Sequence, residues 1–277
     1  MIQDIYPRVF SNNYLQNAVP DEKSIIFSFK TENTIGLVLA GEDTENPFPK
    51  FGKISAEKYI FLFCVDDTKY FLADGEVKAE KFEYVSIRKV RYAENAVKLN
   101  TFAMFTAYHL YTWYISGRYC GKCGNNTELD SKYRVIRCPS CGNLNFPRIN
   151  PAVIVGVTHG DELLITRYAT DRKINYDALV AGFTEIGETL EQTVEREVME
   201  ETGLKVKNIR YYKSQPWGFS GSILAGYFCD VDGDTTVKID ESELKSAKWV
   251  KREDITGQPD DLSLTNEMMK VFRGGKV

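Results

Sequence analysis

The stretch Gly182-Phe-Thr-Glu-Ile-Gly-Glu-Thr-Leu-Glu-Gln-Thr-Val-Glu-Arg-Glu-Val-Met-Glu-Glu-Thr-Gly-Leu204 carries the strongest structural signal in the chain. Thr189 and Gln192 have the spacing of a capping box, and Gly203 is placed to end a helix in the left-handed conformation. No residue between Thr189 and Thr202 breaks a helix. We therefore predict a loop followed by a helix over 189–202, about four turns long.

This helix is predicted to present carboxylates next to its buried face. At 100° per residue, the glutamates at 197, 200 and 201 fall on one side, beside an apolar stripe formed by Leu190, Val194 and Val198. Like charges one turn apart repel each other, so a cation is expected between them. Carboxylate oxygens suit Mg2+ or Mn2+. A solvated acidic helix is the alternative, but it explains neither the glycines of the loop nor the apolar stripe.

Four of the 6 cysteines form two Cys-x-x-Cys units, Cys120/Cys123 and Cys138/Cys141, and each unit is followed by glycine. Two such turns can close a tetrahedral shell of four thiolates around Zn2+, one ion per chain. Because four thiolates fill the shell, the zinc is expected to be structural. A redox pair or two disulfides are the competing interpretations, and a reducing compartment disfavours both.

The sequence before the cysteines predicts a β-rich domain over 1–92 and a connector helix over 93–117, followed by the zinc ribbon over 118–148. Short apolar and β-branched runs predict strands over 24–29, 34–40, 59–65 and 70–72. A hairpin turn is expected over 66–69 and an exposed loop over 41–50. The predicted fold class is α+β.

Composition excludes several kinds of protein. With only 2 histidines in 277 residues, a multi-histidine metal site is impossible, and a net charge of -4 argues against a globally basic nucleic-acid binder. Residues 118–148 nevertheless carry a local charge of +4, which suits RNA or a solvated ribbon surface equally well. The longest apolar stretch, 102–115, is too short for a bilayer span, and the first residues lack a signal-peptide pattern, so a cytoplasmic protein is expected.

The helix and its loop resemble the box of the Nudix hydrolases. Nine positions match at the family's spacing: Gly182, Glu188, Arg196, Glu197, Val198, Glu200, Glu201, Gly203 and Leu204. The resemblance implies a Nudix α/β/α sandwich over 149–277, and strand-like runs at 152–157, 163–166, 209–212, 223–230 and 247–250 fit it. It also implies that Glu197, Glu200 and Glu201 bind catalytic Mg2+ or Mn2+ and that Arg196 orients them.

A second motif narrows the resemblance to the NADH pyrophosphatase subfamily. Ser214-Gln-Pro-Trp-Gly-Phe-Ser-Gly-Ser222 looks like the subfamily's array, although Gly218 and Ser220 stand where prolines are common. Members also carry a four-cysteine ribbon upstream. The likeness implies the substrate contacts Phe183, Trp217, Gln215 and Ser222, with Phe146 as a third aromatic residue; the alternative for Phe183 and Trp217 is a core position. It also implies one more catalytic carboxylate, Glu243, with Glu241 as the register alternative.

The implied reaction is hydrolysis of the pyrophosphate of NAD(H) to NMN(H) and AMP. An NAD cap on RNA contains the same linkage, so free NAD(H) and capped RNA are rival substrates. Another Nudix specificity, for ADP-ribose or diadenosine polyphosphates, is the nearest alternative, and a noncatalytic RNA-binding ribbon protein is a more distant one. Because the resembled family commonly shares its sites between subunits, a homodimer is expected.

Overall fold

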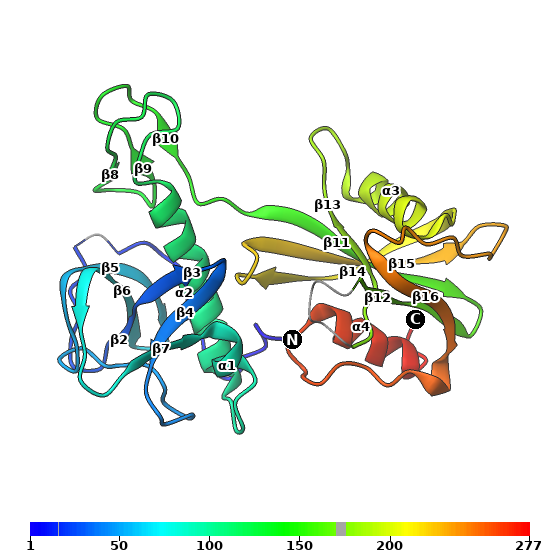
Figure 1. The fold of residues 1–277 in the computed structure, drawn as a ribbon, viewed down its shortest axis with the longest axis horizontal. Helices are drawn as coiled ribbons and strands as arrows, with labels where there is room; N and C mark the ends of the chain where they lie inside the picture. Colours follow the sequence, from blue (N-terminus) through cyan, green and yellow to red (C-terminus); the bar gives the residue numbers. More distant parts are fainter. Residues whose placement is uncertain (16, 170–175) are drawn as a thin grey trace. The chain divides into compact units, whose positions relative to one another are not determined.

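The computed structural model describes residues 1–15, 17–169 and 176–277. Contacts divide the chain into two compact units. The N-terminal unit comprises Asp4–Arg148 with Gly218–Gly221, and the C-terminal unit comprises Met1–Gln3, Ile149–Trp217 and Ser222–Val277. Each unit has its own sheets and helices (Figure 1).

The N-terminal unit is built mainly from strands, as predicted. Its four-stranded sheet has the order β1-β5-β6-β2, and a three-stranded sheet has the order β3-β4-β7. The hairpin between β5 and β6 turns at Asp66, which adopts a φ of 50°. The strand bounds are β1 Phe10–Ser11, β2 Ile25–Phe27, β3 Phe29–Glu32, β4 Ile35–Ala40, β5 Ser55–Val65, β6 Thr68–Lys78 and β7 Glu83–Ser86.

The predicted connector helix differs from the helix observed. After a short helix α1 (Ile87–Arg91), α2 begins at Lys98 rather than at residue 93 and ends at Ser116. Asn95 has a φ of 63°, which interrupts a helix before this point. The helix is apolar around much of its circumference, and it forms part of the core of the N-terminal unit. Phe102 packs edge-on against Phe10, and Tyr108 packs against Phe29 of β3.

The expected exposed loop over 41–50 is exposed only in its first part. Pro47, Phe48 and Pro49 are buried, and the ring of Phe48 packs 4.6 Å from that of Phe27. The prediction was wrong here because the Pro47 and Pro49 carbonyls accept hydrogen bonds from the Gly41 and Ile26 amides at 2.8 and 2.9 Å, which hold this part of the loop against the core.

The C-terminal unit is a sheet covered by a helix on each face (Figure 1). Its strand order is β14-β15-β11-β12-β16, with β13 paired to β11; the β11–β15 pair is parallel and the other pairs are antiparallel. All five predicted strands are present. The bounds are β11 Asn150–His159, β12 Glu162–Tyr168, β13 Val180–Phe183, α3 Leu190–Thr202, β14 Val206–Trp217, β15 Ser222–Val231, β16 Leu244–Lys251, the 3-10 helix η2 Arg252–Asp254 and α4 Leu264–Arg273.

The two faces of this sheet have separate cores. Val194 and Val198 of α3 pack with Val153 and Val155 on one face. On the other face, Met268 and Phe272 of α4 pack with Ile154 and Phe228. Because side chains alternate across a strand, consecutive residues of β11 supply both cores. The α+β fold class predicted from the sequence is confirmed.

Within the described parts of the chain, we find no helix with both the length and the apolar character required to cross a bilayer.

Candidate active site and zinc centre

The predicted carboxylate helix is confirmed as α3. The Thr189 hydroxyl accepts a hydrogen bond from the Gln192 amide at 3.2 Å, and the Gln192 side chain accepts one from the Thr189 amide at 2.8 Å, which completes the capping box. Gly203 ends the helix with a φ of 70°. This conformation is costly for residues with a β-carbon, and the helix therefore stops where the sequence predicts.

Arg196 holds several carboxylates of the box in place. Its guanidinium donates to Glu188 at 2.6 and 2.9 Å, to Glu197 at 2.7 Å and to Glu200 at 3.0 Å. It also donates to the Phe183 carbonyl at 2.9 Å, which ties the helix to the end of β13. These contacts fit the orienting role that the family resemblance implies for Arg196.

Glu188 is the main partner of Arg196, although the sequence indicates no role for it beyond its position in the box. Its hydrogen bonds with Arg196 lower the pKa of the Glu188 carboxyl to about 2, and the Glu185 amide and the Thr193 hydroxyl support the charged form. The same contacts raise the pKa of Arg196. The spacing from 188 to 196 was the only sequence signal for this pair.

The three predicted metal-binding glutamates lie in different environments. Glu201 is buried, Glu197 is partly buried, and Glu200 is largely exposed. Burial raises the pKa of the Glu197 carboxyl, against the opposing effect of Arg196, and the negative charges of Glu200 and Glu243 raise it further. Carboxylate oxygens are donors that Mg2+ or Mn2+ accepts, but among the described residues only the four cysteines bring three or more ligand atoms within 4.8 Å of one another, so metal binding by these glutamates stays a prediction.

The structure brings Glu243 to the same region, because its segment is fastened to the end of α3. The Lys238 amide donates to the Thr202 carbonyl at 2.9 Å, and the Asp240 amide donates to the Glu201 carbonyl at 3.1 Å. The Glu243 amide in turn donates to the Asp240 carbonyl at 3.1 Å. The effect of Glu243 on the pKa of Glu197 reflects this proximity.

Two of the predicted substrate contacts have accessible rings. Phe183 is 53% exposed at the end of β13, and Phe146, in the N-terminal unit, is 62% exposed. Trp217 is partly buried at the end of β14. The exposed ring of Phe183 is at odds with a core position for this residue.

Gln215 and Ser222, the two predicted polar contacts, are buried. The Gln215 side-chain amide donates to the Leu262 carbonyl at 2.8 Å and to Gln3 at 3.1 Å, and its oxygen accepts from the Leu264 amide at 2.7 Å. Gln215 thus fastens β14 to the start of α4. Direct contact of either residue with a substrate stays a prediction.

The four cysteines converge, as predicted. Their Sγ atoms all lie within 4.8 Å of one another, with 3.6 Å between Cys120 and Cys141 and 3.5 Å between Cys123 and Cys138. A zinc–sulfur bond of ~2.3 Å in a tetrahedron requires sulfur atoms ~3.8 Å apart, so the site fits Zn2+. The strands β8 (Glu128–Leu129), β9 (Ile136–Arg137) and β10 (Leu144–Asn145) form the accompanying small sheet.

The backbone of each turn supports the thiolates. Gly124 and Gly142 have φ angles of 75° and 72°, which let the chain fold back around the cysteines. The Lys122 amide donates to Cys120 Sγ at 3.4 Å, and this bond is the largest of the effects that lower the pKa of the Cys120 thiol to about 6. The thiolate is the form that binds zinc.

Comparison with known proteins places the chain in a family. Residues 148–270 match the NUDIX domain, and residues 116–146 match the NADH pyrophosphatase zinc ribbon domain. The NAD-capped RNA hydrolase NudC of Vibrio atlanticus is 37% identical over 239 residues, covering 83% of this chain and 85% of the relative. The chain belongs to the Nudix family. It falls within the NADH pyrophosphatase (NudC-like) group with a zinc ribbon.

Other relatives agree with this assignment. The NAD-capped RNA hydrolase NudC of Actinobacillus succinogenes is 41% identical over 182 residues, which cover 63% of this chain and 67% of the relative. A crystal structure of a NUDIX hydrolase from Nitrosomonas europaea superimposes with a TM-score of 0.50 over 57% of this chain and 92% of that one. Its 18% identity shows a shared fold only.

Proposed function

We propose that this Nudix protein hydrolyses the pyrophosphate of NAD(H) to NMN(H) and AMP, and that it also removes NAD caps from the 5′ ends of RNA. The observation that carries the proposal is the α3 helix, where Arg196 orders the box glutamates of a chain that also has the zinc ribbon. The relatives named NAD-capped RNA hydrolase support it.

The side chains have distinct roles in this reaction. Glu197, Glu200 and Glu201 would hold Mg2+ or Mn2+, which supplies charge neutralisation at the phosphoryl oxygens and lowers the pKa of a bound water. Arg196 keeps Glu197 and Glu200 in position before substrate arrives. Glu243, on the neighbouring segment, serves as a further metal ligand or as the base that accepts a proton from the attacking water.

The substrate is held at its ends by aromatic rings. Phe183 and Trp217 offer faces on which nicotinamide or adenine stacks, at about 1–3 kcal/mol per base by analogy with nucleic acids. Phe146 is the third candidate. The zinc centre takes no part in the chemistry, because four thiolates complete its coordination shell.

The assembly and location of the protein are part of the proposal. A substrate with two bases favours a site that two copies share, so we expect a homodimer; light scattering that gives a monomer mass in fully active protein would rule it out. A cytoplasmic location agrees with the six cysteines, none of which forms a disulfide in the structure.

Product analysis tests the function. NADH incubated with the protein and Mg2+ or Mn2+ should yield NMNH and AMP in equal amounts, and NAD-capped RNA should yield NMN and a 5′-monophosphate end. Faster cleavage of ADP-ribose or a diadenosine polyphosphate would favour the alternative Nudix specificity. RNA binding with no cleavage of any dinucleotide would favour the noncatalytic alternative.

A further inference from the structure

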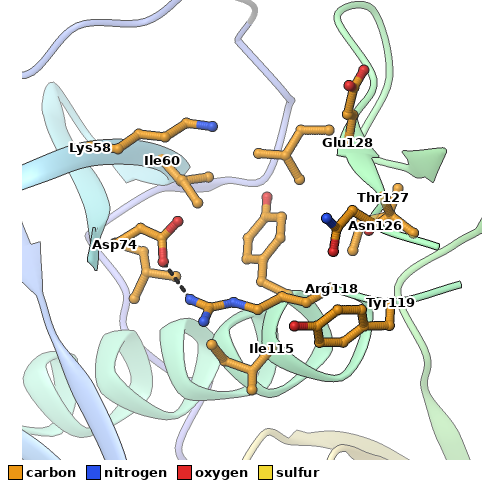
Figure 2. Close-up of a pocket in the computed structure, with 13 residues that line it drawn as sticks. Lys58, Ile60, Asp74, Ile115, Arg118, Tyr119, Asn126, Thr127 and Glu128 are labelled. Carbon is orange, nitrogen blue, oxygen red and sulfur yellow. Dashed lines mark hydrogen bonds and ion pairs between the residues drawn. The ribbon is translucent and has the colours of Figure 1, made fainter. Parts of the chain in front are cut away.

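A cleft lies within the N-terminal unit, whereas the Nudix box belongs to the C-terminal unit. It has a volume of about 490 Å³ and lies between β5, β6, the end of α2 and the first zinc-binding turn (Figure 2). Small-molecule sites typically measure about 300–1,000 Å³ and combine apolar walls with a few polar groups. Here Ile60, Leu72 and Ile136 supply buried apolar surface, and charged side chains stand around it.

The wall formed by the ribbon is held firmly. The Thr127 amide donates to the Arg118 carbonyl at 3.1 Å, and the Thr127 hydroxyl donates to the Gly117 carbonyl at 2.5 Å. A β-carbon on Gly117 would lie 2.4 Å from Ile136, so the glycine permits the ribbon to pack closely against the end of α2. Tyr119 and Asn126 pair across the turn that carries Cys120 and Cys123. The zinc-binding turn therefore shapes the cleft.

The charges around the cleft are balanced in sign. Arg118 forms an ion pair with Asp74 at 2.7 Å, Lys58 extends from β5 at the edge of the cleft, and Glu128 lines the ribbon side with its carboxylate pointing away from that ion pair (Figure 2). A ligand that is only anionic would be repelled by the two carboxylates. A purely apolar ligand would remove all of these charges from water without compensation. The arrangement instead suits a ligand with an anionic group, hydrogen-bond donors and a flat apolar body.

We propose that this cleft binds a nucleoside monophosphate, either as the free nucleotide or as one unit of an RNA strand. The phosphate lies by Lys58 and Arg118, and the base stacks on Tyr119, whose ring is 68% exposed. Glu128 accepts hydrogen bonds from the ribose hydroxyls, and the Asn126 amide contacts the edge of the base. The residues that line the cleft all belong to the N-terminal unit and include none of the Nudix box, so the proposal does not depend on the proposed function.

Calorimetric titration of the full zinc-loaded chain tests this site. The probes are AMP and a five-nucleotide oligoadenylate with a 5′-hydroxyl, without added Mg2+ or Mn2+ so that the Nudix glutamates do not recruit the phosphate. We expect Lys58→Glu to weaken binding at least tenfold and Tyr119→Ala at least fivefold. Lys53→Ala, which removes an exposed lysine outside the cleft, should stay within twofold of the unmodified protein.

The two sources of the nucleotide give different results. Equal affinity for both probes indicates a free mononucleotide, whereas at least tenfold tighter oligonucleotide binding that weakens steeply with salt indicates RNA. Zinc content and melting temperature of each variant should match those of the unmodified protein, and NADH hydrolysis should be unchanged, which separates this site from the proposed function. Binding of neither probe at millimolar concentration, or equal binding by all three variants, would overturn the proposal.

Discussion

Glu197 packs directly against Gly182: a β-carbon on residue 182 would lie 1.9 Å from the Glu197 carboxyl carbon. β13 pairs with β11 at this point, with Gly182 opposite Val153, so the strand cannot easily move away. Because Gly182 has no side chain, it leaves the space that the Glu197 carboxylate occupies. This contact gives a physical reason for a glycine eight positions before the first residue of α3.

Gly182→Ala should therefore displace Glu197 and lower kcat/KM for NADH by about 100-fold, since a misplacement of ~1 Å can have this effect. Overpacking should also destabilise the unit by about 1–3 kcal/mol. Steady-state kinetics with thermal melts measure both effects. Gly274→Ala is the control, because its β-carbon would meet its first neighbour at 3.4 Å. Full activity in Gly182→Ala would show that the placement of Glu197 is not critical.

Glu201→Gln should abolish hydrolysis while the fold is retained. The substitution keeps the size of a side chain that is 2% exposed and removes its charge, so the loss should fall on the chemical step, at about 3 kcal/mol or more of barrier. Turnover at saturating Mg2+ measures it. Glu195→Gln, an exposed glutamate of the same helix, is the control and should leave the rate unchanged. Normal turnover by Glu201→Gln would remove Glu201 from the mechanism.

The Glu188–Arg196 pair should make stability depend on pH in the acid range. Folding lowers the pKa of Glu188 from 4.5 to about 2. The ion pair therefore stabilises the fold fully above pH ~4.5, and this stabilisation is lost as the pH falls toward 2. Glu188→Gln should lower Tm at pH 7, and the difference from the unmodified protein should shrink below pH 4.5. Circular dichroism melts between pH 7 and 3 measure this, with Glu185→Gln as a control in the same loop. A difference independent of pH would contradict the assignment.

Cys138→Ser should remove the zinc and lower Tm. Cys138 is 1% exposed and supplies one of the four sulfur atoms, so a hydroxyl there both weakens the metal site and alters packing. Elemental analysis should find one zinc per chain in the unmodified protein and in Cys64→Ser, whose cysteine lies in β5, outside the cluster. Native protein without zinc would refute the predicted centre.

The sequence predicted the box helix well because local signals determine it. The capping box, the left-handed Gly203 and the apolar stripe all lie within one short segment, and each acts on neighbouring residues. The five Nudix strands were found for a similar reason. Their runs are rich in β-branched and aromatic residues, which predict strands even where most of the strand is exposed, as in β14.

Helix α4 was missed although its sequence carries a signal. Ser263 caps it, and Leu264, Met268 and Phe272 follow at helical spacing, but the helix is short and next to a polar loop. The role of Gln215 could not have been predicted, because its partners lie 47 and 49 residues further along the chain. The contact between Gly182 and Glu197 likewise depends on how β13 and α3 pack together.

Selectivity between dinucleotide substrates should depend on the two aromatic residues Trp217 and Phe183. If Trp217 and Phe183 clamp a base while the box glutamates hold metal ions at the pyrophosphate, NADH should be cleaved faster than ADP-ribose, which lacks nicotinamide. The loss of one stack, at about 1–3 kcal/mol, predicts a 5- to 150-fold lower kcat/KM by order of magnitude. Trp217→Ala should narrow this gap if the indole holds nicotinamide. Both rates should fall together if it holds adenine.

The comparison needs a matched aromatic control and the RNA substrate. Tyr211→Ala removes an exposed ring from the same strand, six residues before Trp217, and should leave the ratio of the two rates unchanged. NAD-capped RNA belongs in the same assay, because its pyrophosphate and nicotinamide are those of NAD and only the 3′ extension differs. Equal kcat/KM for NADH and ADP-ribose in the unmodified protein would show that Gly218 and Ser220 accompany a relaxed specificity, and the proposed preference for NAD(H) would then be wrong.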